Sequence, residues 1–165
     1  MTMKKLNKIV ALLLALTMAL ALTACGGSDT GSSGGSSAAP KTTSATGDMV
    51  TVEVPEGWSL VTGSDMFGTP TADFVCHSES YKVGDAYLQI EQASYNLDDL
   101  KGILESGSPY GTYSGEQALA NGTWYLAENA AAAQLGDKVI LVKGYKCDFG
   151  SAEVHTVLGS LQWVK

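Results

Sequence analysis

The chain has 165 residues and no arginine, and its 17 acidic residues outnumber its 10 lysines, giving a formal charge of −7. Nucleic-acid binding depends on clustered cations, and arginine makes most bidentate contacts to guanine, so this composition argues against a nucleic-acid partner. The composition also changes sharply along the sequence, so we expect only part of the chain to fold as a domain.

The first 24 residues have the layout of an export signal. Lys4, Lys5 and Lys8 precede an apolar run over residues 9–22, and small residues follow it. A basic, then an apolar, then a small-residue region is typical of a secretory signal peptide. The apolar run is shorter than the ~20 residues that cross a membrane comfortably. We therefore predict a cleaved signal peptide over residues 1–24 in preference to a permanent membrane helix.

The end of this signal reads Leu22-Thr23-Ala24-Cys25-Gly26, which resembles the lipobox of bacterial lipoproteins. The resemblance implies that Cys25 receives diacylglycerol and that the signal peptide is cut before it. Two acyl chains hold a protein on a membrane, whereas a single chain binds only reversibly. The expected location is the outer face of the cytoplasmic membrane, with the lipid on Cys25 as the membrane contact. The alternative is an ordinary secretory peptide cut after Ala24.

Residues 25–48 contain little that a folded core could bury. Glycine, serine and threonine dominate this stretch, which predicts a flexible tether behind the lipidated cysteine. Residues 49–165 are different, because they carry regular apolar patterns. Their number is sufficient for one domain with its own core.

The first half of the predicted domain contains strands and one helix. Residues 49–58 alternate apolar and polar side chains up to a Pro-Glu-Gly turn, and residues 73–77 and 86–91 show similar patterns. Asn96 then suits a helix N-cap, and Leu97, Leu100, Ile103 and Leu104 share one helical face. This helix is expected to end near residues 107–109.

The second half predicts an antiparallel meander and a second helix. Strands are expected over residues 113–120, 123–135 and 138–145, separated by Asn121-Gly122 and Gly136-Asp137 turns. The four alanines at 130–133 are the weak point of the middle strand, because alanine prefers helix. A helix near Ser151 with an apolar stripe and a short final strand complete an α+β domain, in which helices pack on the faces of an antiparallel sheet.

Both ends of this domain are similar to the PsbP-like family. Residues 52–58 resemble that family's opening strand and Pro-x-Gly-Trp turn, and residues 154–163 resemble its closing helix and short strand. The resemblance implies an α/β/α sandwich with a central antiparallel sheet. It also implies an accessory or binding role beside larger membrane assemblies, and no shared catalytic residues.

Two cysteines remain in the domain, and they allow two interpretations. Cys76 and Cys147 can pair, which would close a loop of about 70 residues and stabilise the domain by roughly 4 kcal/mol. They can equally remain free buried thiols. His77 follows Cys76, but neighbours on a strand point to opposite faces, and there is no HExxH or paired CxxC motif, so no metal site is expected.

A possible partner contact lies in the glycine-containing loop around Met66 and Phe67, where apolar side chains have little local reason to be. The common hydrolase and nucleotide-binding motifs are absent, so we expect no catalytic residues and no cofactor. The leading hypothesis is a lipid-anchored, non-enzymatic binding or accessory module for an envelope protein. The alternatives are a small-ligand-binding lipoprotein, which predicts an apolar pocket, and a small exported enzyme, which predicts a polar one.

Overall fold

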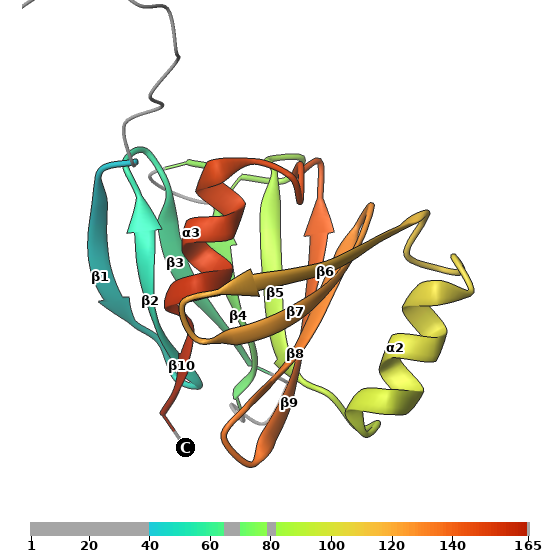
Figure 1. Cartoon of the computed structure of the whole chain (residues 1–165). Helices are drawn as coiled ribbons and strands as arrows, with labels where there is room; N and C mark the ends of the chain where they lie inside the picture. Colours follow the sequence, from blue (N-terminus) through green and yellow to red (C-terminus); the bar gives the residue numbers. More distant parts are fainter. Residues whose placement is uncertain (1–39, 65–69, 79–81, 165) are drawn as a thin grey trace, which may run out of the picture. The chain divides into compact units, whose positions relative to one another are not determined.

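The computed structural model describes residues 40–64, 70–78 and 82–164, which belong to one folded unit over residues 38–165 (Figure 1). A three-stranded sheet has the order β1-β2-β10, with β1 at Thr42–Thr46, β2 at Val50–Pro55 and β10 at Gln162–Trp163. A seven-stranded sheet has the order β3-β4-β5-β9-β8-β7-β6. Its strands, in chain order, are Ser59–Ser64, Pro70–Cys76, Tyr87–Gln92, Tyr113–Leu119, Gly122–Ala127, Ala130–Leu135 and Lys138–Tyr145.

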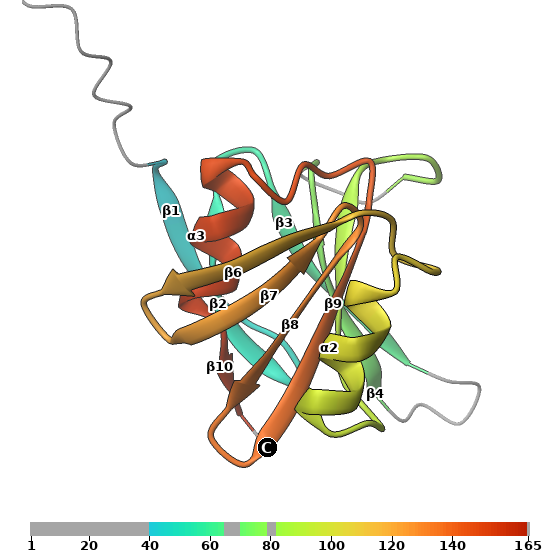
Figure 2. The same ribbon diagram turned by 45° about the vertical axis from the view of Figure 1, so that its right-hand side comes forward.

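All neighbouring strands in the two sheets are antiparallel. Two short helices accompany them: α2 at Leu97–Glu105 and α3 at Ala152–Ser160. The domain is therefore mostly antiparallel β-sheet and only loosely α+β. Both predicted helices are present, and Figures 1 and 2 show α3 beside β2.

The seven-stranded sheet is buried on two different faces. On the face that we call the α3 face, Ala131, Ala133 and Val142 form one core with β2 and α3. On the opposite face, the α2 face, Ala130, Ala132 and Leu141 form a second core with Leu100 and Leu104 of α2. The alternation of β-strand side chains thus sends the alanine run into both cores, and small side chains on both faces let both layers approach β8 closely.

The prediction of one continuous strand over residues 123–135 is wrong. The chain turns back at Glu128-Asn129, so that Ala127 pairs with Ala130 and two strands, β7 and β8, replace one. A single strand of that length would also have been unusual. The alanine run that weakened the prediction is nevertheless a strand, because tertiary burial decides its conformation over intrinsic helix preference.

The tether predicted over residues 25–48 extends too far toward the carboxyl end of the chain, because its last part contains a strand. Residues 42–46 form β1 and pair along β2, from Thr42 opposite Pro55 to Thr46 opposite Thr51. Most β1 side chains are exposed, and Ala45 is the one that packs against the core. Backbone pairing therefore holds this strand, which is why no apolar pattern revealed it. Strand β3 was also missed.

Both helix starts agree with the sequence prediction. The Asn96 side chain accepts a hydrogen bond from the Asp99 N–H at 2.9 Å, and Ser151 Oγ accepts one from the Val154 N–H at 3.3 Å. These side chains satisfy N–H groups that the first helical turn leaves without a partner. A local signal in the sequence was therefore sufficient to locate each helix.

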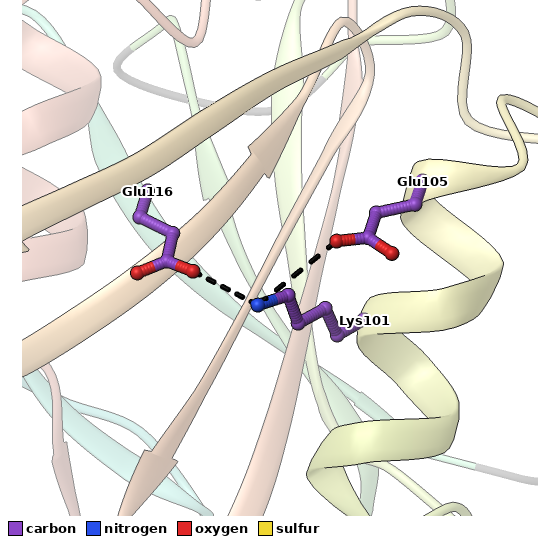
Figure 3. Close-up of polar contacts among 3 residues, drawn as sticks. All are labelled: Lys101, Glu105 and Glu116. Carbon is purple, nitrogen blue, oxygen red and sulfur yellow. Dashed lines mark hydrogen bonds and ion pairs between the residues drawn. The ribbon is translucent and has the colours of Figure 1, made fainter.

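A lysine fastens α2 to the sheet (Figure 3). Lys101 Nζ lies 2.9 Å from Glu116 Oε1 on β6 and 3.9 Å from Glu105 Oε1 on α2 itself. The same ammonium is 4.7 Å from the ring centroid of Tyr125 on β7. The hydrogen bond to Glu116 raises the pKa of Lys101 above its ordinary value. Polar contacts thus complement the apolar core beneath α2.

One buried carboxylate joins the two sheets. Asp73 on β4 is fully buried, and its oxygens accept hydrogen bonds from the backbone N–H groups of Asp48 at 3.3 Å, Met49 at 2.9 Å and Val50 at 3.0 Å. These donors lie at the turn between β1 and β2. A Cβ atom on Gly47 would come within 2.4 Å of Asp73 Oδ2, so the turn approaches the carboxylate too closely for a side chain there.

Replacing Asp73 with asparagine tests this connection. The D73N variant loses the charge that strengthens the three hydrogen bonds, and its amide NH₂ would face a backbone N–H. We expect the free energy of unfolding, measured by urea denaturation, to fall by about 2 kcal/mol. The control D137N removes an exposed carboxylate in the β8–β9 turn and should change it by less than about 0.5 kcal/mol. Equal effects of the two substitutions would contradict the assignment.

Candidate functional site

Helix α2 covers only one part of the α2 face. In the described part of the chain, the apolar core that packs against α2 contains residues of β7, β8 and β9, and none from β3, β4 or β5. In the strand order of the large sheet, β3 and β4 lie at the opposite end from β7 and β8 (Figure 1). Among the residues that the structure describes, the α2 face over β3, β4 and β5 therefore lacks the helical cover that β7 and β8 have.

Four apolar side chains line up on this less covered part, and we call them the aromatic strip: Val61, Phe74, Tyr87 and Tyr145. Register places Val61 opposite Phe74 and Tyr87 opposite Tyr145. Their strand neighbours Leu60, Val75 and Leu88 pack into the core on the α3 face, so alternation sends the strip to the α2 face.

The rings of the strip touch one another. The Phe74 and Tyr87 ring centroids are 5.8 Å apart at an edge-on angle of 69°, and those of Tyr87 and Tyr145 are 5.6 Å apart and stacked. At the ends of the strip, Tyr145 is 44% exposed and Val61 is 37% exposed. The strip is thus an ordered aromatic surface of the kind that binding sites use.

A small apolar hollow opens in the strip, and we call it the Gly63 hollow. It has a volume of about 230 Å³ and is lined by Val61, Thr62, Gly63, Phe74, Cys76 and Tyr87. A Cβ atom at Gly63 would lie 2.6 Å from Phe74 Cε2, so glycine is what allows the ring to stand in its present place. The shape of the hollow therefore depends on the absence of a side chain at position 63.

Charged side chains border the strip on its β9 side. Lys146 Nζ lies 5.1 Å from the Tyr145 ring centroid and donates a hydrogen bond to the Gly84 carbonyl at 3.2 Å. Lys143 Nζ lies 2.9 Å from Glu91 Oε2. Val83, beside Gly84 in the β4–β5 loop, is 97% exposed. The border therefore carries charges of both signs beside an exposed apolar side chain.

A second, more polar hollow of about 370 Å³ lies beside Trp58 and His77, whose rings stack with centroids 4.6 Å apart. Its lining also includes three carboxylates and a cysteine: Glu56, Asp148, Glu153 and Cys147. Burial raises the pKa of Cys147 to about 11, and its Sγ donates a hydrogen bond to the Tyr87 carbonyl at 3.3 Å. At neutral pH this thiol is protonated and is a poor nucleophile.

The two domain cysteines are free thiols in the structure. Cys76 is buried on the α2 face, at the floor of the Gly63 hollow, whereas Cys147 packs against the core on the α3 face. The sheet lies between the two side chains, which explains why they do not form the disulfide considered from the sequence. Burial raises the pKa of Cys76, and the nearby Asp85 carboxylate adds to this effect.

The predicted site residues and the observed site overlap little. Cys25, Met66 and Phe67 lie outside the described residues. Phe74, Tyr87 and Tyr145 were not singled out, although each lies in a strand that the sequence predicted. The alternation of side chains within those strands could have revealed them. Each aromatic residue lies next to an apolar residue that points into the core, so its own ring must point to the other face of the sheet.

Within residues 40–64, 70–78 and 82–164, no group of three or more His, Cys, Asp or Glu side chains is arranged to hold a metal ion. None of the helices in the described part of the chain has the length and apolar composition needed to cross a membrane. Comparison with models of known families, with curated proteins and with solved structures gave no match.

The thiol chemistry can be measured directly. With a pKa of about 11 in place of 9.0, Cys147 should react with iodoacetamide roughly 100-fold more slowly than an ordinary cysteine at pH 8, because only the thiolate reacts. Mass spectrometry of the protein labelled before and after unfolding in urea, without reductant, should find both thiols protected and then both alkylated. A Cys76–Cys147 disulfide in the unreduced protein would contradict the structure.

Proposed function

We propose that this chain is a bacterial lipoprotein, anchored on the outer face of the cytoplasmic membrane through lipid on Cys25. In this proposal its domain is a non-enzymatic binding or accessory module for a protein of the cell envelope. The observation that carries the binding role is the aromatic strip, an ordered and partly exposed row of apolar side chains on a β-sheet face. The lipobox at residues 22–26 supports the anchor.

The size of the Gly63 hollow favours a protein partner over a small molecule. Pockets for small organic ligands usually have about 300–1,000 Å³, whereas this hollow has about 230 Å³. A protein interface often centres on one side chain that inserts into such a hollow and is surrounded by flatter contacts. The rest of the aromatic strip offers that flatter surface.

The second hollow supports the two alternatives to a protein partner, because a polar hollow with carboxylates and His77 is what a small exported enzyme predicts, and its size also suits a small ligand. Its volume of about 370 Å³ is within the usual range, and the stacked Trp58 and His77 rings form a flat wall. Its lining mixes charged and apolar groups, which suits a polar ligand. We rank these alternatives second because half of the lining residues of this hollow, including Glu56 and His77, are solvent-exposed.

The PsbP-like resemblance remains part of the proposal. An antiparallel sheet with α2 on one face and α3 on the other supports an α/β/α arrangement. In this proposal residues 25–39 form the tether, and a Gly/Ser-rich chain of that length spans on average about 20 Å. An anchor of this reach keeps the strip close to other membrane-bound proteins and raises its effective concentration beside them.

The anchor predicts the chemical form of the mature amino terminus. Mass spectrometry of protein from its native membranes should find an amino-terminal peptide that begins at Cys25 and carries diacylglycerol. The C25S variant should lack this modification, and the control C76S should keep it, because only the lipobox cysteine is modified. An unacylated terminus on protein that is released into the medium would contradict the anchor.

The binding role predicts which face of the domain meets a partner. A photo-crosslinking amino acid at Tyr145 should trap one reproducible envelope protein in intact cells. The same group at Tyr95 is the control, because Tyr95 is 58% exposed but lies beyond the opposite end of β5 from Tyr87. A partner trapped equally from both positions, or from neither, would contradict the assignment of the strip.

A further inference from the structure

We infer that the partner protein adds an extended strand to the open edge of β3. This inference rests on the proposed protein partner and goes further, because it names the kind of segment that is recognised and the backbone groups that bind it. It depends on three observations: the place of β3 in the sheet, the direction of its backbone groups and the composition of the strand.

Strand β3 is the last strand at one end of the seven-stranded sheet. It pairs with β4 on one side and, in the described part of the chain, with no strand on the other. Such an edge presents a row of unpaired N–H and C=O groups, and the backbone of another strand matches this row. A small molecule or a lipid surface offers no such alternation of donors and acceptors. The edge of β3 therefore favours a polypeptide partner in an extended conformation.

The hydrogen bonds of β4 determine which of its residues bind β3. The His77 N–H, just after β4, donates to the Ala86 carbonyl at 2.8 Å, in the register that continues the β4–β5 pairing. In an antiparallel sheet, successive residues of a central strand bond alternately to its two neighbours. His77 and the residues two and four positions before it thus bond to β5. Phe74 and Cys76, which alternate with them, bond to β3.

The same alternation gives the direction of the β3 backbone groups. Ser59 and Val61 lie opposite the two β4 residues that bond to β3, so their own backbone groups point toward β4. The N–H and C=O groups of Leu60 and Thr62 therefore point away from the sheet. Within the described residues, no backbone hydrogen bond from another element reaches these four groups. They form a row to which an added strand can bond.

The composition of β3 leaves this edge unprotected. Native proteins usually protect an edge strand with a charge, a proline or a bulge. The edge strand β6 carries Glu116 and has a bulge near its start, and Pro40 and Lys41 directly precede the edge strand β1. Residues 59–62 of β3 are Ser-Leu-Val-Thr, and the irregularity in the β3 pairing comes after them, at Gly63. An added strand therefore meets neither a charge nor a proline on this stretch of β3.

The open edge is continuous with the aromatic strip. Val61, which is 37% exposed and points to the α2 face, belongs to both. Side chains of an added strand alternate between the two faces, so one of them would lie beside Val61 on the α2 face. Apolar pairs across neighbouring strands stabilise a sheet, and such a pair would cover Val61. The recognised segment is therefore extended and has an apolar side chain beside Val61.

Amide hydrogen exchange measures this pairing residue by residue. The lipidated full-length protein is compared in native membranes and after purification in detergent, with exchange read at single amides by fragmentation mass spectrometry. In the purified protein, the outward amides of Leu60 and Thr62 should exchange fast. In native membranes they should exchange about tenfold more slowly or less, because they gain acceptors. The amide of Val61, which bonds to β4, should exchange slowly in both preparations.

A proline at an outward position tests the same bonds by substitution. T62P removes one outward N–H and no bond to β4, and edge strands tolerate proline in this orientation. We expect the crosslink from Tyr145 to the envelope protein to fall severalfold in T62P. The control S44P removes an outward N–H from the edge of β1, as the Gly47 N–H bond to the Val50 carbonyl in the β1–β2 register shows, and should leave the crosslink unchanged. Should T62P fail to fold, the exchange measurement on the unsubstituted protein decides.

Three results would overturn the inference. The first is equal exchange of Leu60 and Thr62 in the two preparations. The second is protection of both amides in the purified protein together with a dimer in sedimentation experiments, which would assign the edge to a second copy of this chain. The third is a Tyr145 crosslink that is equally strong in T62P, and in this case the proposed binding role remains. Protection of the two amides in native membranes without any crosslink from Tyr145 would support the added strand and contradict the strip as the contact.

Discussion

The arrangement of the domain depends on the buried carboxylate of Asp73. It binds three backbone N–H groups where β2 begins and thereby attaches the three-stranded sheet to β4 of the seven-stranded sheet. With β2 held there, α3 packs against it, and the α3 face of the large sheet becomes a closed core. A buried carboxylate is tolerated only when hydrogen bonds satisfy it. The Asp73 side chain therefore requires the β1–β2 turn to lie beside it, and the N–H groups of this turn in turn require an acceptor there.

The open aromatic surface follows from the dimensions of the elements on the opposite face. Seven strands spaced ~4.8 Å apart make a sheet about 29 Å wide, whereas the nine residues of α2 form a helix about 14 Å long. One helix of this size cannot cover such a face, and Lys101 fastens it over β6 and β7. Phe74, Tyr87 and Tyr145 therefore pack against one another and remain partly exposed.

Local signals in the sequence predicted much of the fold, and long-range pairing explains the rest. Asn96 and Ser151 located both helices because a cap depends on residues a few positions away. Strand β1 was missed, because its pairing with β2, and not an apolar pattern, makes residues 42–46 a strand. The aromatic strip was missed for a similar reason: β4, β5 and β9 were predicted and β3 was not, and the long-range order β3-β4-β5-β9 is what brings residues 61 and 145 onto one surface.

The central claim is that the aromatic strip is covered by a partner when the protein is on its membrane. Hydroxyl-radical footprinting measures the solvent exposure of individual side chains and can be applied both to native membranes and to the purified full-length protein. The account predicts that oxidation of Tyr145 and Phe74 falls severalfold in native membranes, while that of Tyr95 stays the same. Equal oxidation of Tyr145 in the two preparations, with protection near Trp58 and His77 instead, would contradict it.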